Sequence, residues 1–247
     1  MRRYLRSALP VLALLATTAA LSMGAEAAAG GEEKAKGGLS LLDLVILAGP
    51  IQWGVLIPLS VICYSMALQY VFTIKRDTLV PDALADDLHN ILAEGPTDEA
   101  VENARNSVSG DTSMLGNILA AAFDKKDFGY EAMKEAAERI GISEHNKYMS
   151  RVGWLSLFAS TATLLGLLGT VSGIIKSFLT MSSAGGAADP SMLAGSIGEA
   201  LVCTATGLFI AIGALYFYFF LRNRVNQAAL DAGVITNEIL DYFRGTK

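Results

Sequence analysis

Three long apolar runs dominate the pattern of the chain. Residues 55–74 contain no charged side chain, and residues 152–181 and 194–221 contain one each. An α-helix needs about 20 consecutive apolar residues to cross a hydrocarbon core of about 30 Å, and each run reaches that length. The pattern therefore predicts three transmembrane helices.

The intervening segment, residues 75–151, is polar and has helical periodicity. Apolar residues recur at helical spacing after Pro81 and stop before Gly95 and Pro96, which end a helix. A second amphipathic stretch covers residues 114–123, and a third over residues 130–148 has no proline to separate it from the second apolar run. The expected fold class is an all-α polytopic membrane protein whose three spans extend into a helical cytoplasmic domain, with residues 222–247 as a cytoplasmic C-terminal helix.

The N-terminal segment has the pattern of a secretory signal. Basic residues at positions 2, 3 and 6 precede an apolar stretch over residues 8–22 and a small-residue Ala-Glu-Ala cleavage signature. The prediction is a signal peptide over residues 1–27, and an uncleaved anchor is the alternative. Residues 28–54 are then a periplasmic tether followed by an interfacial helix, with Trp53 as an interfacial anchor.

Basic residues next to the spans predict the orientation. Lys and Arg follow the first and third runs and precede the second, whereas residues 182–193 between the last two runs contain neither. Cytoplasmic loops are enriched in Lys and Arg. We expect a bacterial inner (plasma) membrane protein with a periplasmic N-terminus, a cytoplasmic domain over residues 75–151, a periplasmic loop over residues 182–193 and a cytoplasmic C-terminus.

Composition narrows the function class. Hydrophobic residues make up 52% of the chain and charged residues 17%, which is too apolar for an ordinary soluble domain, and the net charge of -5 argues against a nucleic-acid surface. Cys63 and Cys203 lie inside apolar runs and offer no disulfide framework or metal spacing. No catalytic set of side chains is present in the pattern, so we expect no enzyme, no metal site and no cofactor.

Small and hydroxyl residues form one stripe in the second run. Its members recur every three or four residues, at Ser156, Ser160, Thr163, Gly166, Thr170, Gly173 and Ser177. At about 100° per residue they share one face of a helix. Small residues let membrane helices approach closely, whereas hydroxyls can instead line a water-accessible path. The sequence leaves both interpretations open.

Lys176 and Glu199 are the charges inside the last two spans, and a charge at membrane depth is a candidate functional site. Counted from the short loop, both lie about 7–8 Å below the outer surface, which would allow an ion pair between helices. Thr170 and Thr204 lie about 7–9 Å deeper and again level with one another. An acidic group above a belt of hydroxyls is what a proton route requires.

Two segments that contain these residues resemble the MotA/TolQ/ExbB proton-channel family. GLLGTVSGIIKSF, residues 166–178, is similar to the family's second-span signature, and DPSMLAGSIGEALVCTATGL, residues 189–208, to its third-span signature. Gly49-Pro50 ahead of a span with Pro58 is also similar. The resemblance covers residues 39–221 and is closest to the ExbB/TolQ-type subunits.

The resemblance implies a function and an assembly. It implies a channel-forming subunit of a proton-motive-force-driven inner-membrane motor that energises outer-membrane transport or integrity. It further implies a homopentamer around an ExbD/TolR-type single-span partner with a membrane aspartate, and a TonB- or TolA-like protein that receives the energy. By motif position, Thr170, Glu199 and Thr204 are the proton-path residues.

The sequence departs from the family pattern at several positions. Thr163 and Gly213 stand where relatives often have proline, Ser172 replaces a larger side chain, and Gln69 and Tyr70 stand near an expected acidic-basic pair. The alternatives are a stator subunit for flagellar or gliding motility and a membrane scaffold that conducts no ions.

Overall fold

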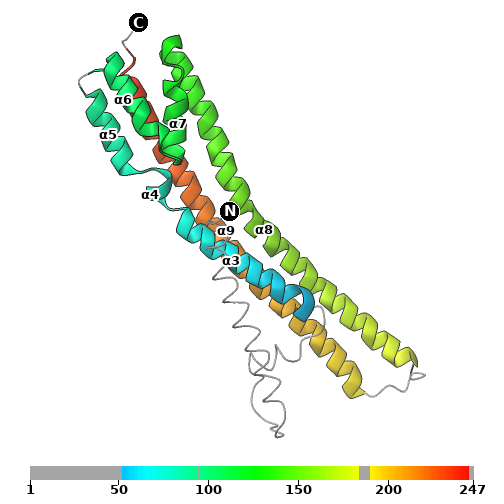
Figure 1. Ribbon diagram of the computed structural model, residues 1–247. Coiled ribbons are helices and arrows are strands. Elements are labelled where there is room, and N and C mark those ends of the chain that lie inside the picture. Colours follow the sequence, from blue (N-terminus) through cyan, green and yellow to red (C-terminus); the bar gives the residue numbers. More distant parts are fainter. Residues whose placement is uncertain (1–51, 94, 184–189, 245–247) are drawn as a thin grey trace. The chain divides into compact units, whose positions relative to one another are not determined.

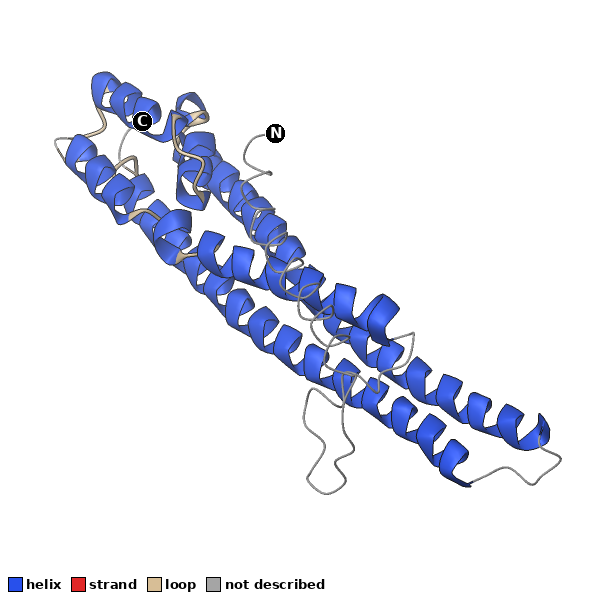
Figure 2. Cartoon of the chain, turned by 60° about the horizontal axis from the view of Figure 1, so that its bottom comes forward, coloured by secondary structure: helices blue, strands red, loops and turns tan. Residues whose placement is uncertain are grey.

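The computed structural model describes residues 52–93, 95–183 and 190–244, and every secondary-structure element in these ranges is helical (Figures 1 and 2). The elements are a short π-helical turn η1 (Gln52–Leu56), α3 (Ile57–Thr73), α4 (Arg76–Leu79), α5 (Asp82–Leu92), α6 (Asp98–Ser109), α7 (Met114–Phe123), the 3₁₀ turn η2 (Lys126–Phe128), α8 (Tyr130–Ser183) and α9 (Pro190–Asp241).

Three of these helices are long and apolar enough to cross a membrane: Gly54–Thr73, Tyr130–Ser183 and Leu193–Asp241. The expected all-α fold with three spans is therefore confirmed. The predicted signal peptide over residues 1–27, and all of the tether and interfacial helix before residue 52, lie outside the described residues. So do residues 184–189 of the predicted periplasmic loop.

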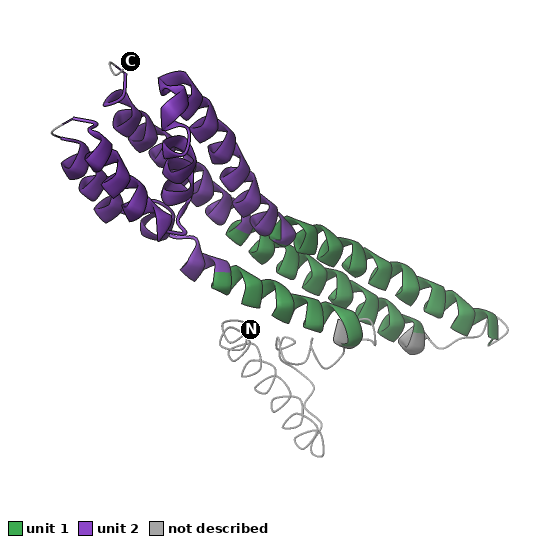
Figure 3. Ribbon diagram, turned by 45° about the horizontal axis from the view of Figure 1, so that its top comes forward, with its two compact units in different colours: residues 1–69, 155–217 green, residues 70–154, 218–247 purple. Residues whose placement is uncertain are grey.

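The described residues divide into two compact units (Figure 3). The membrane unit contains the described parts of residues 1–69 and 155–217, and the polar unit those of residues 70–154 and 218–247. Helices α8 and α9 contribute residues to both units because neither is interrupted. The expectation that the helix beginning near Tyr130 continues into the second span is confirmed.

Caps and turns define the short helices of the polar unit. Thr97 caps α6 by accepting a hydrogen bond from the N–H of Ala100 at 3.2 Å, and Ser113 caps α7 by accepting one from Gly116 at 3.0 Å. Such caps satisfy N–H groups that have no partner inside the helix. Gly129 has a φ of 87°, which other residues rarely adopt, and this lets the chain turn into α8.

The polar unit has its own apolar core. Helices α5 and α7 match the predicted amphipathic stretches, and their apolar faces are buried. The core also contains side chains from α8 and α9, including Met133 and Ile239. Sequence periodicity missed α6 because its buried stripe consists of the small residues Val101, Ala104 and Val108 in an otherwise polar segment.

Ion pairs connect the surface of the polar unit. Arg76 contacts Asp82 at 2.8 Å and Asp231 at 2.9 Å, which links α4 to α5 and α9. The hydrogen bond from the Arg76 guanidinium lowers the pKa of Asp82 below its ordinary value. A bond from Lys126 lowers the pKa of Asp98 in the same way. These side chains are largely exposed, so they orient the helices more than they stabilise them.

Candidate functional site

Helices α8 and α9 approach each other closely in the membrane unit. A Cβ atom added at Gly207 would lie 2.6 Å from the carbonyl oxygen of Ala162 and 3.0 Å from the Cα atom of Gly166. One added at Gly173 would lie 2.5 Å from the Cβ of Ala200. The backbones of α8 and α9 therefore meet with no large side chain between them, as in other small-residue contacts between membrane helices.

The contact uses a 4-3-4 spacing on both helices. On α8 the residues are Ala162, Gly166, Gly169 and Gly173, and on α9 they are Ser196, Ala200, Cys203 and Gly207. Cys203 is buried, and its thiol lies where a side chain on Gly169 would be. Its role is that of a small filler at the contact.

The Thr204 hydroxyl makes a hydrogen bond between the two helices. Its Oγ1 donates to the carbonyl oxygen of Gly166 at 2.7 Å. In a regular α-helix that same carbonyl accepts the N–H of Thr170, four residues later. Thr170 and Thr204 therefore meet at one backbone carbonyl, within a turn of each other along the helix pair.

The other hydroxyls of the predicted stripe bond to their own helix. Thr170 Oγ1 donates to the carbonyl of Leu167 at 2.7 Å. Ser160, Thr163 and Ser177 donate to carbonyls four residues back at 3.0–3.1 Å. These bonds satisfy the donor of each hydroxyl locally, and both lone pairs on each oxygen remain able to accept a hydrogen bond from water or another donor.

The residues of the predicted stripe differ in how deeply they are buried. Gly166 and Ser177 are buried, Gly173 and Thr170 are half-buried, and Ser160 and Thr163 are exposed in the single chain. The face of α8 that packs on α9 also contains Ala162 and Gly169, which the predicted stripe did not include. The matching 4-3-4 spacing of small residues in both runs was the signal that could have found them.

Lys176 and Glu199 lie together, with 3.2 Å between the lysine Nζ and the glutamate Oε2. Their side chains are 62% and 27% exposed in the single chain. Glu199 directly precedes Ala200, which contacts Gly173, and Lys176 follows Gly173 by three residues, so the pair lies about 1.5–4.5 Å along the helices from the Gly173 contact. From Glu199 to Thr204 the rise along α9 is about 7.5 Å.

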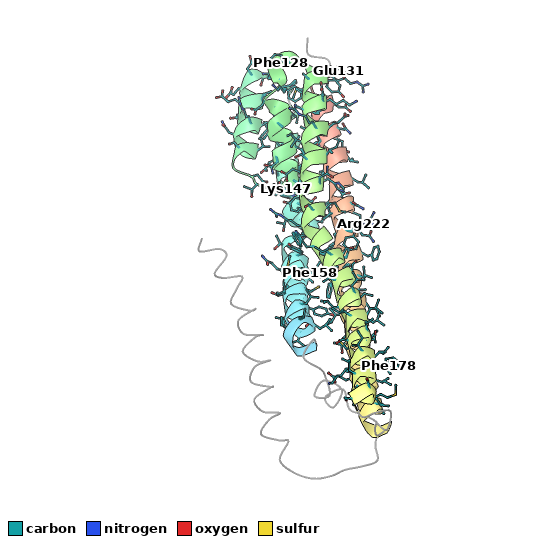
Figure 4. The ribbon with its side chains drawn as sticks, turned by 90° about the vertical axis from the view of Figure 1, so that its right-hand side faces the viewer. Phe128, Glu131, Lys147, Phe158, Phe178 and Arg222 are labelled. Atoms are coloured by element: carbon teal, nitrogen blue, oxygen red, sulfur yellow. The ribbon has the colours of Figure 1, made fainter. Side chains whose placement is uncertain are left out.

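Helix α3 packs against α9 through an aromatic side chain. The Tyr64 ring lies 6.4 Å from that of Phe217, edge to face, and its hydroxyl lies where a side chain on Gly213 would be. Glycine at position 213 therefore provides room for Tyr64. Helix α9 is continuous through Gly213, and α8 is continuous through Thr163. Figure 4 labels Phe158 and Phe178, which lie on α8 before and after Thr163.

Metal chemistry has no support in the described part of the chain. No three His, Cys, Asp or Glu side chains gather there as metal ligands would. The arrangement instead consists of hydroxyls, one carboxylate and one amine between two closely packed apolar helices.

Replacing Gly207 with alanine should disrupt the helix pair, because the added methyl would meet the backbone of α8. Overpacking typically costs about 1–3 kcal/mol, and we expect a lower thermal unfolding temperature in detergent. The matched control is Gly198→Ala, also on α9, where an added Cβ has no atom within 4 Å. Equal melting temperatures for the two variants would contradict a close contact at Gly207.

The chain is similar in sequence to several known proteins. The model of the MotA/TolQ/ExbB proton channel family matches residues 111–232. The chain is 29% identical over 191 residues to the putative biopolymer transport protein ExbB-like 1 of Synechocystis sp., covering 76% of this chain and 72% of that one. It is 31% identical over 134 residues to the biopolymer transport protein ExbB of Xanthomonas campestris pv. campestris, covering 54% and 49%.

A further relative is the Tol-Pal system protein TolQ of Haemophilus influenzae, 43% identical over 89 residues, which cover 36% of this chain and 39% of that protein. The aligned part thus spans 72% of the ExbB-like protein but only about half or less of the Xanthomonas ExbB and the Haemophilus TolQ. Among solved structures, that of C. jejuni MotAB matches with a TM-score of 0.43 and 15% identity. The match covers 95% of this chain and 87% of that chain. At this score the likeness bears on neither fold nor function. The family match and the named relatives agree with the two span signatures, and the chain belongs to the MotA/TolQ/ExbB proton channel family.

Proposed function

We propose that the chain is the channel-forming subunit of an ExbB/TolQ-type motor, which uses the proton-motive force across the inner membrane to energise outer-membrane transport or integrity. The observation that carries this proposal is the hydrogen bond from Thr204 to the Gly166 carbonyl, beside Thr170. It joins the two apolar helices at one backbone carbonyl, one and a half turns from Glu199, and the Thr170 hydroxyl donates to the carbonyl of the next residue on α8, Leu167.

Hydroxyls and a carboxylate suit a proton path. A hydroxyl both donates and accepts a hydrogen bond, so Thr170 and Thr204 can pass a proton to a neighbouring group without a net charge of their own. Glu199 adds a negative charge that attracts a cation toward the hydroxyls. Within this proposal Ser160, Thr163, Gly166, Gly173 and Ser177 are packing or pore-stripe residues.

The chain needs a partner to move protons. Residues 55–74, 152–181 and 194–221 contain no aspartate, and Glu199 is their single carboxylate. We therefore propose that an ExbD/TolR-type single-span protein supplies a membrane aspartate inside a homopentamer of this chain. A TonB- or TolA-like protein would receive the energy.

The proposed topology follows the distribution of Lys and Arg. The N-terminus and residues 182–193 face the periplasm, and residues 75–151 and 222–247 face the cytoplasm. The polar unit, with its ion pairs and exposed carboxylates, has the surface of a domain in water.

The chain alone should conduct protons poorly. Because its spans lack an aspartate, we expect proton flux into vesicles only when the single-span partner is co-reconstituted. The measurement is pH-gradient-driven flux followed with an internal pH-sensitive dye. Strong flux from the chain alone would contradict the need for a partner carboxylate.

Thr204→Val and Thr170→Val should abolish flux in the complex with the partner while leaving assembly intact. Valine keeps the shape of threonine but removes the hydroxyl, and hydrogen bonds between membrane helices contribute only about 0.6 kcal/mol on average. Thr206→Val is the matched control, since that hydroxyl donates to Val202 on its own helix. Normal flux in both test variants would contradict the proposed path and leave the two hydroxyls with a packing role.

Lys176→Met should impair assembly more than the double change Lys176→Met with Glu199→Gln. Removing the amine leaves the carboxylate uncompensated at membrane depth, and an unpaired charge there is the unfavourable state. The readout is the yield of folded oligomer by size-exclusion chromatography. If Lys176→Met assembles normally, the amine extends to the interface and Glu199 acts without it.

A further inference from the structure

A charged cavity lies at the ends of the first and third apolar runs, within the polar unit. It has a volume of about 320 Å³ and is lined by Lys75, Arg76, Asp77, Arg224, Gln227 and Asp231, with Ala228 at its base. Ligand pockets range from about 300 to 1,000 Å³. This cavity is thus large enough for a small polar group and too small for a whole lipid.

Its position along the chain is that of a membrane surface. The first apolar run ends at Ile74 and the third at Leu221, so Lys75 follows its span directly and Arg224 follows its span by three residues. Arg224 Nη1 lies 3.5 Å from the carbonyl oxygen of Val71, which connects the ends of the two spans. The cavity therefore lies at the depth of lipid headgroups.

Aromatic rings accompany both cations. The Lys75 ammonium is 5.9 Å from the centroid of the Phe72 ring, and the Arg224 guanidinium is 4.4 Å from that of Phe220. Phe72 is 69% exposed in the single chain, as expected of a side chain that faces lipid. Cations over exposed rings at the end of a span hold the charge at the interface.

Two of the three cations of the cavity have no ion-pair partner within the described residues. Arg76 is in contact with two carboxylates, Asp82 and Asp231. Lys75 and Arg224 have no carboxylate within 4 Å among residues 52–93, 95–183 and 190–244, although with Asp77 the cations and carboxylates here are equal in number. Two cations without direct partners next to a membrane surface favour a bound anion.

We infer that this cavity binds the headgroup of an anionic phospholipid, with the phosphodiester between Lys75 and Arg224. Phosphatidylglycerol fits the remaining groups. Its headgroup hydroxyls can donate to the Asp77 carboxylate, and the Gln227 amide can donate to a phosphate or hydroxyl oxygen. None of the residues that line the cavity belongs to the proposed proton path.

The test is a titration of the purified full-length chain in detergent with phosphatidylglycerol, followed by native mass spectrometry. Lys75→Gln and Arg224→Gln should each weaken binding about fivefold, because each basic residue near an anionic surface contributes about that factor. Phosphatidylcholine, which has a phosphate but no net charge, and inorganic phosphate as a competitor separate a lipid site from a simple phosphate site.

Arg222→Gln is the matched control. Arg222 projects from α9 two residues before Arg224 but does not line the cavity (Figure 4). We expect this variant to retain wild-type affinity, as should Lys125→Gln, which removes an exposed cation beside Phe128. Lys75 is exposed, so Lys75→Gln remains informative even if Arg224→Gln unfolds.

Four results would overturn the inference. Equal weakening by Arg222→Gln would indicate nonspecific attraction to the membrane surface. Displacement of phosphatidylglycerol by inorganic phosphate would indicate a site for free phosphate. Equal binding of phosphatidylcholine, or no saturable binding at all, would show that the two cations do not select an anionic headgroup.

Discussion

The close approach of α8 and α9 is the constraint on which the membrane unit depends. Lipid tails are as apolar as leucine, so membrane helices gain little from burying apolar side chains against each other. They associate instead where small residues let the backbones meet. Gly166 and Gly207 provide that contact here, and a methyl group at Gly207 would collide with the backbone of α8.

This contact also determines what the threonines can do. Thr204 reaches the Gly166 carbonyl across the interface because no side chain stands between the helices. A larger residue at position 166 or 207 would separate the helices and remove the bond. Packing and the proposed proton path are therefore two consequences of one arrangement, and the two interpretations of the small-residue stripe do not exclude each other.

The polar unit is built on a different principle. Its short helices have caps, an apolar core and ion pairs, which is the construction of a domain in water. The exception is the group of cations that follows the first and third spans. Arg76 is occupied by two carboxylates, whereas Lys75 and Arg224 are paired with aromatic rings and a backbone carbonyl. That difference distinguishes residues that orient helices from residues available to a ligand.

The sequence alone determined the three spans, the helices α5 and α7, and the unbroken course of α8 from Tyr130. These follow from the length of apolar runs and from helical periodicity, which are local properties. The family could also be recognised from the sequence, because its signatures are contiguous. Helix α6 could not be predicted from the sequence, because its small buried residues give a weak periodic signal.

Only the tertiary structure decided which face of α8 meets α9. Small and hydroxyl residues occur on two adjacent faces of the second span, and periodicity cannot rank them. The choice depends on the facing residues Ala200, Cys203 and Gly207 in a helix far along the chain. A contact between two helices is a property of the pair, so its partners, and the Thr204 hydroxyl that bridges them, appear only when both are folded together.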